Sequence, residues 1–457
     1  MRRYLVFVSA ALGLLMYSID STAVAVAFPN FMREFNANVL WAAWTISIYY
    51  IGTTTAMPLA GNLSDMFGRK KVFLISLILF TVGSLACGFA PNMYTLIVFR
   101  FFQGIGGASF LPTASGIVAD HFPENRERAI GLFTSIFPIG GIIGPNLGGW
   151  IVSRFSWRYI FYINLPVGIC LTALILVLLR DTRVSSRPRV DFKGALLMSG
   201  TVLFLMFGLN IVAENFSVRS LLYTAGFLCL SFILFLLFFR QERREINPIL
   251  DLSLLRSKPF LAANLLNMII GAAGFGIFSF VPLLATSVYK LSTLMSGMIL
   301  TPRSIGTISS SAVTSFLLKR CGYRVPMIVG LTIISLTTII LGQGQLWGAV
   351  AVRIGSAEVL SILILITGVG MGIAFPAANN ACIELMPEKV ASIVGLRGMF
   401  RTVGGALGIS IITLILHSSV SPSTGFKITF SIFGFGLLSS IPLVMLMPTG
   451  KKGWGGA

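Results

Sequence analysis

The sequence predicts an all-α integral membrane protein, built as two six-helix bundles with two further helices inserted between them, fourteen transmembrane helices in all. Three observations predict this fold. Hydrophobic residues make up 55% of the 457 positions and charged residues only 11%, whereas soluble domains carry roughly 25% charged residues. The apolar residues gather in long stretches, and the two halves of the chain share a pattern of glycine, proline and acidic residues.

The apolar stretches have the length of membrane-spanning helices, which need about 20 mostly apolar residues each. The segments between them are too short to form a soluble domain. The expected spans, with the uncertainty of a few residues that such boundaries carry, are 4–28, 39–60, 72–90, 93–119, 129–153, 159–179, 194–213, 220–239, 259–284, 292–318, 325–345, 357–383, 390–416 and 428–447.

The net charge of +19 is distributed as membrane topology predicts. Lys and Arg fall in short clusters between the apolar stretches, without the basic, aromatic-interleaved patch of a nucleic-acid surface. Most of these clusters lie in alternate loops, on the side of the N-terminus. Because cytoplasmic loops are enriched in Lys and Arg, we expect both termini to be cytoplasmic and no nucleic-acid partner.

The second half of the chain repeats the first at a nearly constant offset. Gly104 and Gly106 recur as Gly368 and Gly370, and the match continues without a gap through acidic, proline and glycine positions. We therefore expect a six-helix bundle at 1–180, two inserted helices with their cytoplasmic loops at 181–258, and a second bundle at 259–457. Two such halves with a substrate site near the bilayer midplane form a known transporter architecture.

Three glycine-rich motifs follow or lie within expected spans of the first half, and a fourth motif ends the first span. The sequence GNLSDMFGRKK occupies 61–71, RFFQGIGGA occupies 100–108, and GGIIGPNLGG occupies 140–149. The first span ends with IDSTAVAVAFP at 19–29. Glycines at helical spacing let two helices approach closely, and a proline within a helix bends it.

These motifs resemble those of the major facilitator superfamily, written GxLaDrxGrkxxl, RxxQGxGaA and gxxxGPxxGG, and the last is associated with antiporters. The segment 19–29 is similar to LDxTIVNVALP of the fourteen-helix drug:proton antiporter branch, with Ala25 where that signature has Asn. Ser64 likewise replaces the usual Ala of the first motif. The resemblance covers the whole chain.

The resemblance implies roles for two groups of residues. Asp65, Arg69 and Asp120, with the turn at Gly68, would form an inner-face charge cluster that acts in gating; the alternative is an ordinary positively charged loop. The antiporter motif would comprise Gly140, Gly144, Pro145, Gly148 and Gly149.

Asp20 is the acidic residue that we place deep within a span, and ionisable residues there are functional candidates by default. A poorly solvated carboxylate can load and release a proton near neutral pH, which makes Asp20 the candidate proton carrier. The alternative is a static ion pair with a buried arginine. Both descriptions can hold in different conformational states.

Four arginines also lie within expected spans: Arg100, Arg303, Arg397 and Arg401. Against a single acid they leave the interior positive, which favours an anionic or zwitterionic substrate. Alternatively, Arg100 is a structural residue of its motif and Arg397 extends to the cytoplasmic surface. The candidate substrate-binding residues are Arg303, Arg401, Arg100, Asn264 and Asn267.

We interpret the chain as a proton-coupled secondary transporter that exports amphipathic small molecules, as multidrug antiporters do, by alternating access. An exporter of a specific anionic or zwitterionic metabolite or lipid is the alternative, and a non-transporting membrane sensor is a third. We expect no enzymatic activity, cofactor or metal, because neither a GxxxxGK[ST] sequence nor a metal-ligand spacing occurs. The expected partners are a small-molecule substrate, protons and the lipid bilayer, with a monomer in the plasma or inner membrane of a bacterium.

Overall fold

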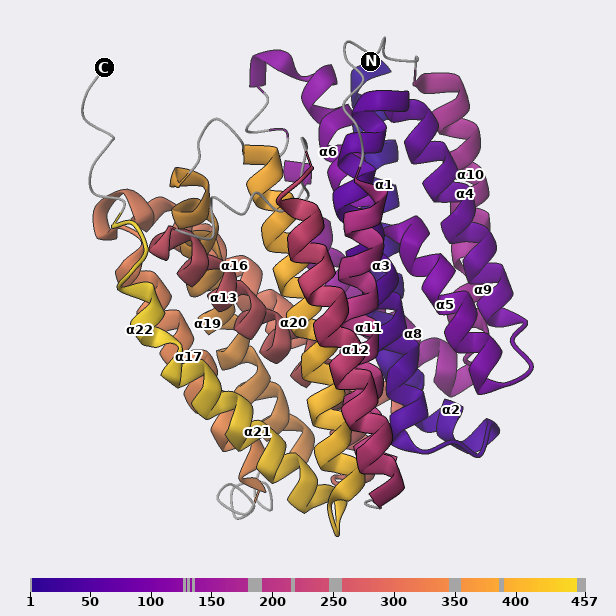
Figure 1. The fold of residues 1–457 in the computed structure, drawn as a ribbon, viewed down its shortest axis with the longest axis vertical. Helices are drawn as coiled ribbons and strands as arrows, with labels where there is room; N and C mark the ends of the chain where they lie inside the picture. The colour runs from indigo at the N-terminus through magenta and orange to yellow at the C-terminus, as the bar shows by residue number, and fades with distance from the viewer. Residues whose placement is uncertain are drawn as a thin grey trace. The chain divides into compact units, whose positions relative to one another are not determined.

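The computed structural model describes residues 2–125, 129, 132–133, 136–179, 191–214, 218–245, 257–344, 355–385 and 390–449. All regular elements in this part of the chain are helices (Figure 1), which confirms the all-α class. The chain forms two compact units, Met1–Leu250 and Asp251–Ala457.

The first unit contains the helices that carry Asp20 and the glycine motifs of the first half. Its elements are α1 (Arg2–Ala23), η1 (Val24–Ala27), α2 (Phe28–Glu34), α3 (Val39–Phe67), α4 (Arg69–Gly88), α5 (Met93–Gly107), α6 (Phe110–His121), η2 (Pro123–Asn125), α8 (Ile136–Arg154), α9 (Tyr159–Tyr162), α10 (Asn164–Leu178), α11 (Phe192–Glu214) and α12 (Val218–Glu242).

The second unit contains the other embedded arginines. Its elements are α13 (Lys258–Gly271), η4 (Ala272–Ile277), α14 (Phe278–Ser287), α15 (Thr293–Met298), α16 (Thr301–Cys321), α17 (Arg324–Gly342), α19 (Ser356–Glu384), α20 (Val390–Ser418), α21 (Pro422–Ser439) and α22 (Ile441–Val444). The segment η4 is a π-helical turn between α13 and α14, a distortion that often marks functional sites.

Twelve helices among the described residues are long and apolar enough to cross a membrane. They coincide in order with twelve of the fourteen expected spans. The other two expected spans correspond to α3, of 29 residues, and α16, of 21 residues. Many Ser and Thr residues make α16 less hydrophobic than its neighbours, so the count of fourteen stays a prediction.

Helix ends in both units follow from local sequence. Asn38 caps α3 by accepting a hydrogen bond from the Trp41 N–H at 3.1 Å, and Asn92 caps α5 in the same way. Gly68 joins α3 to α4 with a φ of 93°, and Gly322 follows α16 with a φ of 69°. This left-handed backbone favours glycine, so the tight turn expected after the second span is present.

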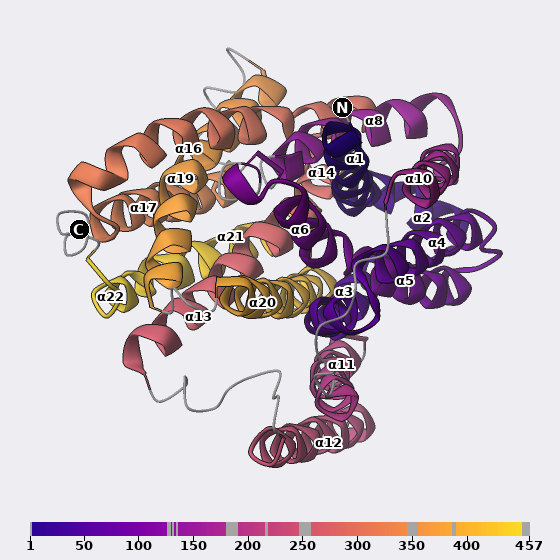
Figure 2. The same cartoon turned by 90° about the horizontal axis from the view of Figure 1, so that it is seen from above.

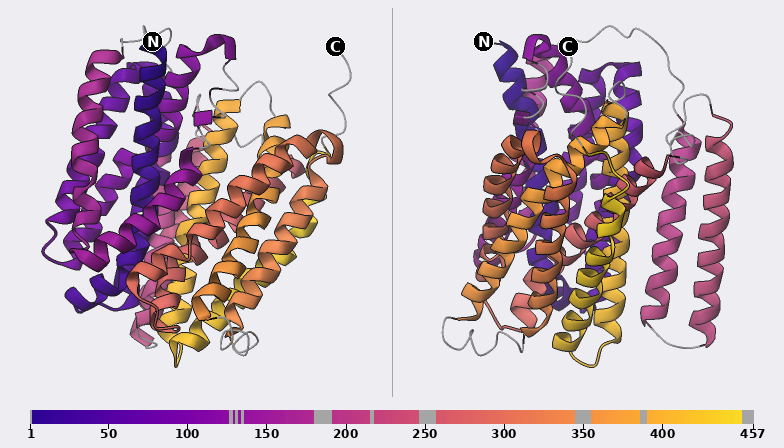
Figure 3. Two further views of the ribbon diagram at one scale, coloured as in Figure 1. Left: turned by 180° about the vertical axis from the view of Figure 1, so that it is seen from behind. Right: turned by 90° about the vertical axis from the view of Figure 1, so that its left-hand side faces the viewer.

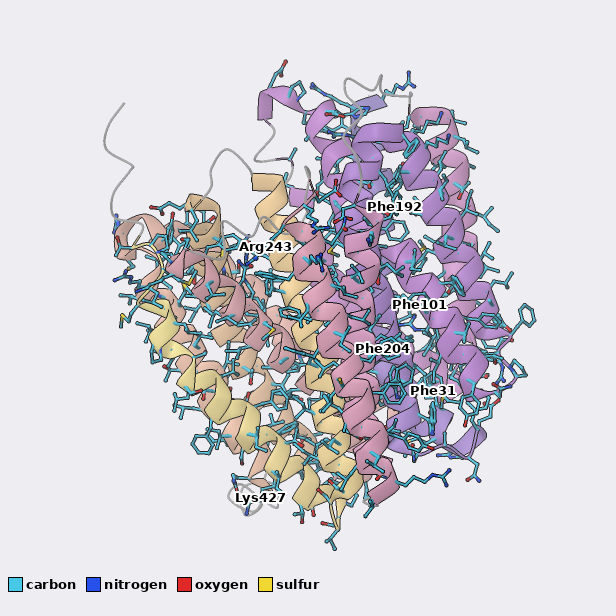
Figure 4. All side chains as sticks on the ribbon, in the orientation of Figure 1. Phe31, Phe101, Phe192, Phe204, Arg243 and Lys427 are labelled. Carbon is cyan, nitrogen blue, oxygen red and sulfur yellow. The ribbon has the colours of Figure 1, made fainter. Side chains whose placement is uncertain are left out.

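The inserted helices α11 and α12 pack against each other within the first unit. The rings of Phe204 and Phe227 stack with their centroids 5.8 Å apart, and Figure 4 labels Phe204 on α11. The ring centroids of Trp44 on α3 and Phe207 on α11 are 4.7 Å apart. Figures 2 and 3 show α11 between α3 and α12, so α12 is the outer helix of the pair. The three-part division of the chain stays a prediction.

Candidate transport site

Asp20 lies at the centre of a buried hydrogen-bond network in the first unit, on α1 and only 1% exposed. Arg100 Nη1 on α5 donates to Asp20 Oδ2 at 2.7 Å. Gln103 Nε2, one turn along α5, donates to Oδ1 at 2.9 Å, and Asn164 Nδ2 at the start of α10 donates to the same oxygen at 2.9 Å. We refer to Asp20, Arg100, Gln103 and Asn164 as the Asp20 network.

Arg100 is fully buried and is held by groups from several helices. Its Nε donates to the Thr45 carbonyl at 3.1 Å, and Nη1 also donates to Gln103 Oε1 at 2.7 Å. Its guanidinium lies 4.0 Å from the ring centre of Tyr49, a cation–π contact. Its charge is therefore compensated within the unit, and only Nη2 lacks a hydrogen-bond partner.

Asn164 is fixed by a further contact that orients its amide. Its Nδ2 also donates to Ser84 Oγ on α4 at 2.9 Å, and Ser84 Oγ donates to the Phe161 carbonyl at 2.9 Å. The Asp20 carboxylate is thereby connected to α4, α5 and α10. A change in its charge would therefore alter hydrogen bonds that involve three neighbouring helices.

The glycines of the expected antiporter motif bring α8 against α1 beside Asp20. A Cβ on Gly140 would collide with Ser18, and one on Gly144 with Thr22 and the Ile19 carbonyl. One on Gly148 would lie 3.0 Å from the Ala23 carbonyl oxygen. Pro145 lies inside α8, and Gly149 is buried in it.

At the turn from α3 to α4, two residues of the expected inner-face charge cluster meet. Arg69 Nη1 lies 3.0 Å from Asp120 Oδ2 on α6, and both side chains are partly exposed, 22% and 39%. Gly116 leaves the space that the Arg69 guanidinium occupies, because a Cβ there would lie 2.5 Å from Nη1. The Asp65 side chain lies outside the part of the structure that is described.

The second unit places a different pair at the positions that the repeat relates to Arg69 and Asp120. Tyr323 follows Gly322, and Glu384 ends α19. Burial, together with the charge of Glu384 and the hydrogen bond to it, raises the pKa of Tyr323 above its ordinary value. An ion pair in the first half thus corresponds to a tyrosine–carboxylate hydrogen bond in the second.

Two of the candidate substrate-binding arginines lie against neighbouring aromatic rings of one helix in the second unit. The Arg303 guanidinium on α16 is 4.3 Å from the ring centre of Phe278, and that of Arg401 on α20 is 5.2 Å from Phe275. Phe275 belongs to the π-helical turn η4. Arg100 belongs to the first unit and is part of the Asp20 network.

The two candidate asparagines lie one turn apart on α13. Asn264 Nδ2 donates to the Phe260 carbonyl at 3.0 Å, and Asn267 Nδ2 to the Ala263 carbonyl at 2.9 Å. Asn267 Oδ1 accepts a hydrogen bond from Arg397 Nη2 at 3.2 Å. Arg397, which the sequence also allowed to extend to the cytoplasmic surface, is held by Asn267.

Comparison with known proteins assigns the family. A sequence model of the Major Facilitator Superfamily matches residues 10–207 and 192–409. The chain belongs to the Major Facilitator Superfamily. It is a multi-pass membrane transporter, a class of protein that binds small-molecule substrates and is not enzymatic.

Curated relatives of this superfamily cover most of the chain. "Multidrug resistance protein 3" of Bacillus subtilis is 30% identical over 409 residues, which cover 88% of this chain and 77% of that protein. The "Tetracenomycin C resistance and export protein" of Streptomyces glaucescens is 29% identical over 416 residues, which cover 90% of this chain and 76% of that protein. The multidrug and export character expected from the motifs agrees with these relatives.

Solved major facilitator structures share the fold. The human organic anion transporter MFSD10 (TETRAN) superposes with a TM-score of 0.66 at 15% identity, covering 97% of this chain and 99% of its own. The xylose transporter XylE from E. coli gives a TM-score of 0.65 at 13% identity, with 96% of each chain covered. The predicted major facilitator fold is confirmed.

Two residues of the Asp20 network, Gln103 and Asn164, were not among the candidates from the sequence. Gln103 lies three residues after Arg100, so the two share one face of a helix, and that spacing was a usable signal. Asn164 is a lone polar residue in an apolar stretch, which also marked it. Nothing in the sequence indicated that Arg100 would contact the Thr45 carbonyl or the ring of Tyr49.

Proposed function

We propose that this superfamily member is a proton-coupled exporter of amphipathic small molecules that works by alternating access and antiport. The Asp20 network carries the proposal. It places one carboxylate, paired with one arginine, where water is excluded. In such surroundings a charged group is costly unless it is compensated, so the protonation of Asp20 and its pairing with Arg100 are alternatives.

A proton on Asp20 would cancel its charge and weaken its attraction to Arg100. The guanidinium would keep its contacts with the Thr45 carbonyl, Gln103 Oε1 and the Tyr49 ring, so it would remain compensated in part. The connection between α1 and α5 would loosen, while α5 itself would stay in place. Proton binding would in this way favour one arrangement of the helices around Asp20 over another.

The rest of the first unit supports a cycle of this kind. The glycine contacts between α1 and α8 provide a smooth surface beside Asp20, and the pair of Arg69 and Asp120 provides a contact that a gating movement can form and release. A shift of α1 would be transmitted to both. The names of the relatives support efflux as the direction of transport.

The same proposal places the protein in the plasma or inner membrane of a bacterium with both termini in the cytoplasm. The distribution of Lys and Arg along the sequence supports the orientation, and the bacterial relatives support the compartment. We propose a monomer as the working unit.

The test is gradient-driven exchange in proteoliposomes with an acidic lumen and a lumenal pH dye. Addition of ethidium, a cationic drug, or of mandelate, an organic anion, should make the lumen more alkaline as protons leave in exchange for cargo. Asp20→Asn should abolish this pH change yet retain exchange of labelled cargo between the two sides without a gradient. A wild-type pH response in the Asp20→Asn variant would refute the role of Asp20.

Thermal unfolding in detergent is the control for this test. Loss of both exchange modes together with a large fall in the melting temperature would show that Asp20→Asn has damaged the fold, and the pH result would then be attributed to the broken ion pair. Retained exchange with lost coupling is the outcome that supports proton carriage.

A further inference from the structure

Arg397 on α20 carries a charge that no acidic side chain among the described residues pairs with. Its Nη2 donates to Asn267 Oδ1 at 3.2 Å, and its buried Nε has no hydrogen-bond partner. None of the ion pairs among the described residues includes it. A guanidinium has five N–H donors and does not lose its proton in proteins, so within the described part of the chain most of the Arg397 donors have no acceptor.

Arg100 shows what this fold does when it holds a buried arginine permanently. That side chain has a carboxylate partner at 2.7 Å, a backbone carbonyl, an amide oxygen and an aromatic ring. Among the residues that the structure describes, Arg397 donates to one amide oxygen. Arg397 is half-buried, with its Nε shielded from solvent. Because a charge that is removed from water without compensation is expensive, its retention here calls for a partner that is present only part of the time.

The neighbours of Arg397 define what such a partner would meet. Asn264, one turn from Asn267 on α13, is 1% exposed, and its Oδ1 accepts no hydrogen bond from the described residues. Cys382 of α19, 2% exposed, lies with its Sγ 3.9 Å from Asn267 Nδ2. Arg401, one turn along α20, adds a second positive charge close enough to repel that of Arg397. We call Asn264, Asn267, Cys382 and Arg397 the Arg397 cluster.

Close helix packing holds this cluster in place. A Cβ on Gly404 would collide with the carbonyl of Met268, the residue after Asn267, and one on Gly271 would collide with the Arg401 carbonyl. The backbones of α13 and α20 therefore touch directly beside the cluster. The π-helical turn η4 begins at the next residue, Ala272.

We infer that the Arg397 cluster is a subsite for an organic oxyanion, a carboxylate or phosphate group, on a molecule that also carries a hydrogen-bond donor. The oxyanion accepts from the free N–H groups of Arg397, which match carboxylate and phosphate geometry. The donor, a hydroxyl or amide N–H, meets Asn264 Oδ1. The inference specifies the chemical class of the ligand. That the ligand is transported cargo rests on the proposed export function.

The test measures binding to the full chain in phosphatidylcholine nanodiscs, with no proton gradient. Three matched probes are used: mandelate, with a carboxylate and an adjacent hydroxyl; neutral mandelamide; and phenylacetate, which lacks the hydroxyl. Mandelate should bind about tenfold or more tightly than mandelamide. Arg397→Gln should remove that difference, and Asn264→Leu should remove the advantage of mandelate over phenylacetate. Equal affinities of the wild type for mandelate and mandelamide would overturn the inference.

A stability measurement separates a ligand site from a structural role. Without ligand, Arg397→Gln should unfold at the same temperature as the wild type or higher, since it removes an uncompensated charge. Arg100→Gln, which breaks a compensated network, should unfold at a clearly lower temperature. A loss for Arg397→Gln equal to that for Arg100→Gln would show that Arg397 serves the fold and not a ligand.

Two further outcomes identify the source of the oxyanion and the part of the argument that fails. If phosphatidylglycerol in the nanodisc weakens mandelate binding in the wild type but not in Arg397→Gln, the site belongs to a lipid headgroup and the assignment to cargo is wrong. Binding is measured without a proton gradient, so a failure of the Asp20→Asn experiment would not affect the binding result at the Arg397 cluster. Equally, a failure of the binding experiment would not affect the test of proton coupling.

Discussion

At the scale of single residues, the two units hold arginines in opposite ways. Arg100 is surrounded by groups that neutralise or accept from it, whereas Arg397 donates to one amide oxygen among the described residues. The difference follows from the partners: α1 brings a carboxylate to Arg100, and α13 brings Asn267 to Arg397. An identical side chain is therefore a fixed part of the Asp20 network in one unit and a candidate ligand contact in the other.

Asn164→Ala tests whether the Asp20 carboxylate depends on its neutral donors. The change removes a hydrogen bond to Oδ1 and leaves Ser84 without its amide partner. A buried polar group that loses its partner costs about 1–3 kcal/mol, so we expect a lower melting temperature in detergent.

Thr172→Val, also on α10, is the matched control for Asn164→Ala. The Thr172 hydroxyl donates to the carbonyl of Gly168 on its own helix, so its loss should change the melting temperature little. An equal effect of the two substitutions would assign Asn164 to general helix packing.

At the scale of elements, close contacts between helices recur at equivalent places in the two units. Gly144 on α8 packs against α1, and Gly408 on α20 packs against the carbonyl of Ala272 in η4. In both units the first helix departs from regular α-helix near this contact, as a 3₁₀ turn at Val24–Ala27 and a π-helical turn at Ala272–Ile277. Both halves therefore combine a close helix contact with a local break in the first helix.

Gly144→Ala and Gly408→Ala should each reduce transport, because the added methyl group would meet Thr22 or the Ala272 carbonyl. Forcing an extra carbon into a packed contact costs about 1–3 kcal/mol, which thermal unfolding would detect. Gly226→Ala on α12 is the control, since nothing lies within 4 Å of its Cβ position. Full activity of Gly144→Ala would show that α1 and α8 tolerate greater separation than the close contact suggests.

The ion pair of Arg69 and Asp120 allows a charge-swap test of gating. Arg69→Asp and Asp120→Arg should each lower transport and favour the inward-open state, because two like charges would face each other. The double variant should recover transport. Since the pair is partly exposed and such pairs contribute about 0–1 kcal/mol, the melting temperature should hardly change. Unaltered transport in both single variants would reduce these residues to ordinary loop charges.

At the scale of the whole molecule, the repeat provides two similar frameworks that carry different chemistry. The first unit holds an acid with a paired arginine, and the second holds arginines beside aromatic rings and amides. Such a division suits a transporter in which one half responds to protons and the other to cargo, which is the assignment that the proposals above make.

The expected orientation of the whole chain can be tested by labelling. Val420, before α21, is fully exposed and falls in a loop that we expect on the outer side. Phe67, at the end of α3, is 54% exposed and is expected on the inner side. With the exposed native cysteines replaced by serine, a membrane-impermeant maleimide should label Val420→Cys in intact cells and Phe67→Cys only after the membrane is opened. The reverse pattern would invert the topology.

The sequence by itself determined the membrane class, the order of the helices and the repeat. It also singled out Asp20 as the leading candidate for the proton carrier. Hydropathy and glycine spacing are properties of residues that are close together in the sequence. Each can therefore be interpreted before it is known which helices pack against each other. The turn at Gly68 and the contact between Arg69 and Asp120 were also predictable, because a recurrent motif encodes them.

Only the tertiary structure decided which polar groups meet. Asn164 reaches Asp20 across 144 positions of sequence, and Arg100 reaches it across 80. Such contacts depend on how each helix is rotated about its axis and how far it is shifted along it, and side-chain packing sets both. For the same reason the sequence could not tell that Arg100 is paired with a carboxylate while Arg397 is held by a single amide.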